Sequence, residues 1–256
     1  MQGVPPPIRD LELRDRLNDL LGEALSKPGQ AATLYALRAF LRLVGAQGRG
    51  EVACDVLVGA VEDDLREAGL GVPAMEAIGN LLDCQLLHRT GNGGEQSRVV
   101  PSEELRRELS AVISRAEAYC RALETLSRRK IRSAGEVERA MERAACLFNE
   151  GLFFEVHEVL EAVWLEQEGQ VRPLLQGLIQ IAVGFHHLEN KNFGGAVSLL
   201  REGLDKVKDY SPARFGLELD RFLQGAEGCA RSIESLGRDA FDRFDRRMIP
   251  QMRLLQ

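Results

Sequence analysis

The stretch FNEGLFFEVHEVLEAVW, from Phe148 to Trp164, decides the fold of the larger part of this chain. Its apolar residues recur at steps of three and four, which predicts an amphipathic helix over residues 153–166. Such a helix turns one stripe inward in a helical bundle. We expect this stripe to consist of Phe153, His157, Leu160 and Trp164.

The next long segment, RPLLQGLIQIAVGFHHLEN at residues 172–190, is apolar almost all round. A helix of this kind is expected at the centre of a bundle, antiparallel to the one before it. Gly177 and Gly184 would let a neighbouring helix approach closely. His186 lies on the same otherwise apolar surface, so each of the two helices carries a histidine.

The first helix begins its polar motif as metalloprotease helices do, with His157 and Glu158, but Glu161 stands where the second histidine should be. A zinc protease needs both histidines, so this class is strongly disfavoured. Glu161 follows His157 by four positions and lies on nearly the same side, while Glu155 is expected to point away. The candidate ligand-binding or buried polar cluster contains His157, Glu158, Glu161, Trp164, Gln176, Gln180 and His186.

Three interpretations of this cluster remain open. The first is a buried polar network in which each group is hydrogen-bonded and no ligand is needed. The second is a divalent metal held by His157, Glu161 and His186 from facing helices. The third is a small-ligand pocket or hydrolytic site with His157 as base and Glu161 as its orienting partner, for which Cys146 is a weak nucleophile candidate.

These residues also resemble the family called domain of unknown function 309. The resemblance covers about residues 140–210 and rests on FNEGLFFEVHEVLEAVW, LLQGLIQIAVGFHH and the NFGGA that follows. The resemblance implies a small all-helical domain, and it does not indicate any particular activity. The matching positions are Phe148, Asn149, Gly151, Glu155, His157, Glu158, Glu161, Trp164, Gln176, Gly177, Gln180 and His186.

The N-terminal part has a different pattern. Apolar spacing predicts helices over residues 11–25, 33–44, 52–68 and 73–82, and LLHRT and SRVV are predicted strands joined by the turn GNGGEQ. Over about residues 30–101 this order resembles a winged-helix domain, with Val72–Leu82 in the position of the recognition helix.

The charges in this part argue against DNA binding. Residues 1–100 carry ten Lys/Arg and fourteen Asp/Glu, and the predicted recognition helix has no basic residue. Because DNA binding depends on cations that neutralise phosphates, nucleic acid is disfavoured as a partner. Arg38, Arg42 and Arg49 would restore this function only if the fold gathered them on one face.

The sequence thus predicts a mainly α protein with a winged-helix-like domain at residues 1–101, a connecting helix at 102–132 and a bundle of about five helices at 133–256. Ser102, Ser133 and Asn192 are expected to cap helices. Five widely spaced cysteines predict free thiols, and with no signal peptide or membrane-spanning segment expected, a cytoplasmic location follows.

The leading functional prediction is a non-enzymatic helical protein that binds a protein partner, a second copy of itself or a ligand, with a buried His/Glu cluster. One alternative is a winged-helix DNA-binding transcriptional regulator. Another is a metal-dependent enzyme that uses His157, Glu161 and His186.

Overall fold

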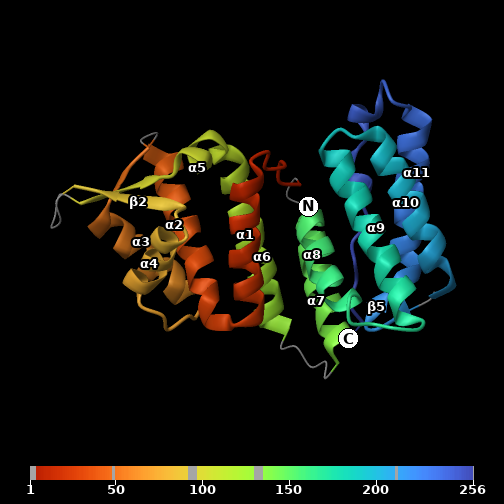
Figure 1. The fold of residues 1–256 in the computed structure, drawn as a ribbon, viewed down its shortest axis with the longest axis horizontal. Coiled ribbons are helices and arrows are strands. Elements are labelled where there is room, and N and C mark those ends of the chain that lie inside the picture. Colours follow the sequence, from red (N-terminus) through yellow and green to blue (C-terminus); the bar gives the residue numbers. More distant parts are fainter. Residues whose placement is uncertain (1–3, 48–49, 92–96, 130–134, 211–212, 256) are drawn as a thin grey trace. The chain divides into compact units, whose positions relative to one another are not determined.

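The computed structural model describes residues 4–47, 50–91, 97–129, 135–210 and 213–255, and most of them are α-helical (Figure 1). The predicted mainly α fold class is therefore confirmed. The chain divides into two compact units, which we call the N-terminal unit (Pro6–Glu124) and the C-terminal unit (Met1–Pro5 with Thr125–Gln256). The division falls within helix α6, whereas the sequence suggested a separate connecting segment at residues 102–132, and those boundaries stay a prediction.

The N-terminal unit consists of short helices and a small sheet. Its elements are α1 (Leu11–Ser26), η1 (Pro28–Gln30), α2 (Ala31–Gln47), β1 (Val52–Ala53), α3 (Cys54–Glu67), α4 (Ala74–Asp83), β2 (Leu87–Thr90), β3 (Arg98–Pro101), α5 (Glu103–Arg107) and most of α6 (Leu109–Arg129). The four predicted helices and both predicted strands are present. The predicted turn between the strands falls mainly on residues 92–96, outside the described residues.

The three strands form an antiparallel sheet in the order β1-β3-β2. Strand β1 was not predicted, because a two-residue strand has no periodicity of its own. Val52 pairs with Val99, so the third helix begins at Cys54 rather than at Val52. The long helix predicted from Ser102 is also interrupted, at Glu108, although the side chain of Ser102 caps its start by accepting a hydrogen bond from the Leu105 amide.

Helix α2 forms the centre of this unit, since nearly every residue from Ala31 to Leu41 is buried. Among these, Arg38 is only 6% exposed, and its Nε donates to Asp64 of α3 at 2.9 Å. Arg42 binds Asp64 and, through Nε at 2.8 Å, Glu117 of α6. Two of the three arginines that could have formed a basic face are therefore neutralised by carboxylates of their own unit. Arg49 lies outside the described residues.

The C-terminal unit is a helical bundle. Its elements are α7 (Glu136–Asn149), α8 (Phe153–Trp164), α9 (Val171–Glu189), α10 (Phe193–Val207), η2 (Lys208–Tyr210), β4 (Ala213–Arg214), β5 (Leu217–Glu218), α11 (Leu219–Leu236), η3 (Phe241–Arg243) and η4 (Arg246–Met248). The predicted cap Asn192 is confirmed, because its Oδ1 accepts from the Gly195 amide at 3.1 Å. Ser133 lies outside the described residues, and the N-cap of α7 is Gly135.

An aromatic cluster forms the core of this bundle. Phe148, at the end of α7, is fully buried, and its ring meets Phe153, Phe185 and Phe222 at centroid distances of 5.0, 5.6 and 5.2 Å. All three contacts have the edge-to-face geometry that aromatic pairs prefer. The motif that opens with Phe148 therefore joins α7, α8, α9 and α11 through one side chain.

Helices α9 and α10 approach each other closely at glycines, as the sequence predicted for α9. A Cβ added to Gly177 would lie 2.9 Å from the carbonyl oxygen of Gly203, and one added to Gly184 would lie 2.8 Å from Leu200 Cγ. The two backbones are thus close enough to exclude side chains larger than hydrogen at these points. Helix α9, packed between α8 and α10, occupies the central place that its composition indicated.

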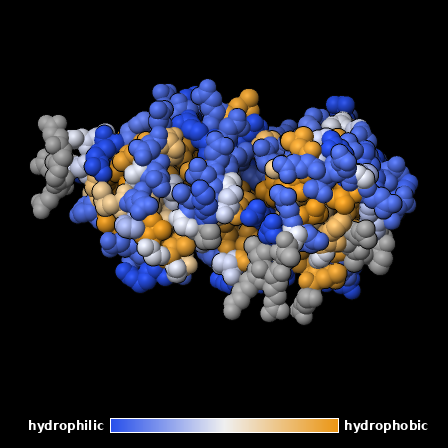
Figure 2. Space-filling view, turned by 60° about the horizontal axis from the view of Figure 1, so that its bottom comes forward, coloured by the Kyte–Doolittle hydropathy of each residue, from blue (hydrophilic) through white to orange (hydrophobic). Residues whose placement is uncertain are grey.

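None of the described helices combines the length and the apolar composition needed to cross a membrane. On the face in Figure 2, hydrophobic patches are interspersed among hydrophilic residues. The large apolar side chains that the described residues leave exposed are Leu11, Val56, Met75, Leu165, Met248 and Leu255.

Candidate functional site

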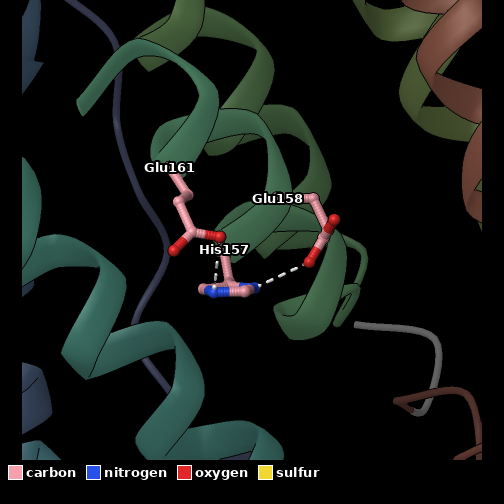
Figure 3. Close-up of side chains that lie close together, drawn as sticks. All are labelled: His157, Glu158 and Glu161. Atoms are coloured by element: carbon pink, nitrogen blue, oxygen red, sulfur yellow. Dashed lines mark ion pairs between the residues drawn. The ribbon is translucent and has the colours of Figure 1, made fainter. Parts of the chain in front are cut away.

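Two glutamates of α8 lie beside the imidazole ring of a histidine on the same helix. His157 Nδ1 lies 2.9 Å from Oε1 of Glu158, and His157 Nε2 lies 3.3 Å from Oε2 of Glu161. Figure 3 shows Glu161 at one end of the ring and Glu158 at the other. We call His157, Glu158 and Glu161 the α8 cluster; one ligand atom from each lies within 4.8 Å of the other two.

The α8 cluster is open to solvent, which corrects the prediction that the His/Glu cluster is buried. The side chains of His157, Glu158 and Glu161 are 22%, 47% and 44% exposed. The inward stripe of α8 consists instead of Phe153, Val156, Leu160 and Val163. Val156 and Val163 rotate the buried face away from His157 and Trp164, because apolar burial sets the orientation of an amphipathic helix.

The Nδ1 atom of His157 is shielded from solvent but has no hydrogen-bond partner among the described residues. The distance of 2.9 Å from Nδ1 to Glu158 Oε1 is therefore a close contact without hydrogen-bond alignment. A buried polar atom usually has a hydrogen-bond partner. The interpretation of this cluster as a fully satisfied polar network does not fit that atom.

Glu155 is buried although, as the sequence indicates, it points away from the inward stripe of α8. It is only 1% exposed and lies on a different side of the helix from the inward stripe. Apolar spacing could not reveal it, because an acidic residue in a helix is usually solvated. The burial of Glu155 could have been suspected only because Glu155 is one of the positions that match the family motif.

His186 does not join the α8 cluster. Its Nε2 lies 3.0 Å from Asn190 Nδ2, one turn further along α9. The ring of Phe154 lies near both histidines, with centroid distances of 5.6 Å to His157 and 5.3 Å to His186. Of the three metal ligands predicted from the sequence, His157 and Glu161 therefore lie together, whereas His186 contacts Asn190.

Trp164 lies at the other end of α8, under the guanidinium of Arg172. The Arg172 carbon Cζ stands 3.9 Å from the indole centroid, which is a cation–π contact. Arg172 Nη1 also donates to the carbonyl oxygens of Trp164 and Gln167, each at 3.1 Å. Arg172 therefore closes the turn between α8 and α9, a role that the sequence did not reveal.

The two glutamines predicted as cluster members on α9, Gln176 and Gln180, are not in contact with the α8 cluster in any hydrogen bond described for them. Gln180 Nε2 donates to Glu202 Oε2 of α10 at 2.9 Å, which directs the side chain toward α10. Gln176 is half-buried.

Cys146, the weak nucleophile candidate, is 4% exposed on α7. Burial raises the pKa of its thiol to about 11. The thiolate is the nucleophilic form of cysteine, so this thiol is poorly suited to attack a substrate at neutral pH.

Residues 141–199 match a family model described as Domain of unknown function (DUF309). These residues belong to that family. The DUF309 segment contains most of α7, all of α8 and α9, and the start of α10. Searches among curated proteins and among solved structures gave no significant match.

The DUF309 segment thus contains every residue of the α8 cluster together with Phe148, Glu155 and the two α9 glycines. Some of the motif residues named above hold the bundle together, as Phe148 and Gly177 do. Others, in the α8 cluster, carry polar groups that no packing role explains. The second group is where a function of the DUF309 segment is to be sought.

Proposed function

We propose that this chain is a non-enzymatic ligand-binding protein, and that its DUF309 segment binds a divalent cation at the α8 cluster. The observation that carries the proposal is the geometry of His157, Glu158 and Glu161, whose ligand atoms lie within 4.8 Å of one another on a solvent-accessible face. A zinc ion has bonds of about 2 Å to histidine nitrogen and carboxylate oxygen. Because Glu158 lies beside Nδ1 and Glu161 beside Nε2, the side chains would have to rotate to place all three ligand atoms on one ion.

The chemistry of the donor set supports a cation. Imidazole with carboxylate oxygens suits zinc, iron or manganese better than calcium, which takes oxygen ligands only. The two carboxylates would offset the two positive charges of the ion. The shielded Nδ1 of His157 has no hydrogen-bond partner among the described residues, and coordination to an ion would use its lone pair.

Binding is favoured over the metal-dependent enzyme because of the position of His186. The enzyme interpretation needs His157, Glu161 and His186 on one ion, but His186 Nε2 is engaged by Asn190 and the Phe154 ring lies near both imidazoles. The buried, high-pKa thiol of Cys146 also weakens the hydrolytic alternative.

Isothermal titration of the full chain, purified without a histidine tag, with ZnCl2 and MnCl2 tests this proposal. We expect one ion per chain, and a loss of affinity of at least about tenfold in His157→Ala and in Glu161→Gln, since even outer partners of metal ligands contribute that much. His186→Ala is the matched control and should bind as the wild type does.

Circular dichroism of each variant checks that the fold is retained. Equal stoichiometry and affinity in the wild type and in His157→Ala would rule out the α8 cluster as the site. A loss in His186→Ala as large as in His157→Ala would restore the set of three ligands predicted from the sequence.

For the N-terminal unit we propose a winged-helix-like domain that makes protein contacts. Its order α2-β1-α3-α4-β2-β3, with a sheet ordered β1-β3-β2, supports that arrangement. Helix α4, in the recognition position, carries Glu76 in its first turn and the exposed Met75. An acidic and apolar surface suits a protein partner better than DNA phosphates.

A further inference from the structure

Residues 241–255 form a segment that we call the strap, which follows α11 and lies outside the DUF309 segment. It contains no α-helix; η3 and η4 are short 3-10 helices, and Leu254 forms an isolated antiparallel bridge with Leu217. Four of its side chains are buried in the C-terminal unit, each no more than 7% exposed: Phe241, Phe244, Ile249 and Met252. An irregular segment with this much buried apolar surface is bound to the bundle rather than lying loosely on it.

The polar contacts of the strap recognise its backbone. Asn149 at the end of α7 donates from Nδ2 to the Met252 carbonyl oxygen at 2.9 Å and accepts from the Met252 amide at 2.8 Å. One side chain thus satisfies both backbone groups of a residue, as a neighbouring β-strand would. Further along, the Glu218 amide donates to the Arg253 carbonyl oxygen at 2.9 Å.

Ion pairs add selectivity for side chains of the strap: Lys191, just after α9, pairs with Asp242, and Glu189 pairs with Arg246. Arg246 Nε donates to both carboxylate oxygens of Glu189, at 2.9 and 3.2 Å, and the Glu189 side chain is only 10% exposed. Burial raises the pKa of Glu189, while Arg246 counteracts this. Arg246 is therefore the cation that favours the charged form of this carboxylate.

The receiving surface is shaped for an extended chain. A Cβ at Gly225 of α11 would lie 2.6 Å from Pro250 Cβ, so the strap passes directly over that glycine. Cys229, also on α11, donates from Sγ to the Met248 carbonyl oxygen at 3.2 Å. Asn149, Glu189, Gly225 and Cys229 together form the surface that we call the seat.

We propose that the seat is a peptide-binding groove, and that the strap of a second copy of this chain can occupy it in place of the chain's own. The fit demands an extended segment with arginine followed by apolar residues at the third and sixth positions after it, as in Arg246, Ile249 and Met252. Any second copy carries this segment, and exchange of an identical element between chains needs no new contacts. Gly237, with φ of 68° at the end of α11, is the hinge from which the strap departs.

The test uses two full-length variants that break opposite halves of the contact. Arg246→Ala leaves an intact seat with a weakened strap, and Glu189→Gln leaves an intact strap with a weakened seat. Mixed one to one, the strap of the Glu189→Gln chain should enter the seat of the Arg246→Ala chain. We expect hetero-pairs, measured by native mass spectrometry, at least about tenfold above the pairing of either variant alone, which corresponds to about 1.4 kcal/mol.

The double variant Glu189→Gln with Arg246→Ala, mixed with Glu189→Gln, is the matched control and should not pair above background. The alkylation rate of Cys229 reports whether the strap has left the seat, and that of buried Cys120 in the N-terminal unit reports global unfolding. Faster Cys229 alkylation with unchanged Cys120 supports an opening strap. A mixture that pairs no better than the single variants, with Cys120 protected, overturns the proposal. Should Arg246→Ala not fold, Arg246→Lys takes its place.

Discussion

Arg38 and Asp64 are two charged residues inside the N-terminal unit, with side-chain exposures of 7% and 11%. Removing one partner from a buried ion pair leaves the other charge without compensation, whereas the pair as a whole adds little. Asp64 also binds Arg42, so the carboxylate connects two arginines of α2 to α3. The pair fixes how these helices meet.

We therefore expect Arg38→Ala to lower the free energy of unfolding by about 3–5 kcal/mol, measured by urea denaturation. Arg66→Ala removes an exposed pair with Asp63, whose side chains are 72% and 70% exposed, and should cost no more than about 1 kcal/mol. Equal effects of the two substitutions would contradict the structural role assigned to Arg38.

At the scale of single residues the sequence predicted which side chains come together better than how deeply they are buried. The spacing of His157 and Glu161 correctly placed them side by side on one helix. It overestimated the burial of His157 and missed that of Glu155 and Asp64, since both depend on what other helices present. Long-range partners such as Arg246 for Glu189 have no signature in local spacing.

Helices α9 and α10 approach each other closely at Gly203 as well. A Cβ at Gly203 would lie 2.5 Å from the Gly177 carbonyl oxygen and 2.8 Å from the Ile181 amide nitrogen. Both are backbone atoms, so the helices would have to separate. We expect Gly203→Ala to destabilise the protein by about 1–3 kcal/mol in a denaturant titration, despite the higher helix propensity of alanine.

Gly228 of α11 provides the matched comparison, since a Cβ there would meet nothing within 4 Å. Gly228→Ala should be neutral or stabilise the protein by up to about 1 kcal/mol. A stabilising Gly203→Ala would mean that α9 and α10 are not held as closely as described.

The start of α10 depends on the neutral form of His187. The Asn192 Oδ1 atom caps the helix, which directs Nδ2 toward His187 Nδ1 at 3.1 Å, so that nitrogen must accept the hydrogen bond. Burial lowers the pKa of His187 below its usual value near 6.5. Between the two pKa values the unfolded chain binds more protons than the folded one.

Stability from His187 is therefore complete above about pH 6.5 and is lost as the pH falls through the lowered pKa. We expect His187→Gln to flatten the fall in melting temperature between about pH 6.5 and 5. His88→Gln, at an exposed histidine of β2, should leave that pH profile unchanged, and a profile equal to wild type in His187→Gln would refute this role.

The ends of helices could be predicted from the sequence where a capping or helix-breaking residue marks them. The caps Ser102 and Asn192 and the stop at Gly237 were predictable from residue type. The interruption at Glu108 and strand β1 were not, because both arise from pairing and packing with distant segments. Gly177 predicted a close approach of another helix, but the sequence did not show that the residue facing it is Gly203.

On the scale of the whole molecule, the net charge of −6 and the internal use of arginines predict weak attraction to nucleic acid. In fluorescence anisotropy we expect no binding to duplex DNA at about 150 mM salt. Binding to duplex DNA whose affinity falls steeply with salt would contradict this and restore the transcriptional-regulator alternative. Arg89→Ala, at the exposed arginine of β2, would then separate a wing contact from one made elsewhere.

The sequence indicated two regions of different composition, and only the second contained a recognisable motif. The match at residues 141–199 confirms that recognition, while the winged-helix resemblance of the first region stays a prediction. The difference has a physical basis. A motif with fixed polar positions can be recognised from few residues, whereas alternating helices and strands are shared by many folds.

Trp164 is the only tryptophan in the chain, and it lies three positions after Glu161, under Arg172. Its indole nitrogen is shielded from solvent. The tryptophan emission of the protein therefore comes from the end of α8, close in sequence to the α8 cluster. An ion that reorients Glu161 would change that emission, which makes the protein its own optical reporter of occupancy, with no dye attached.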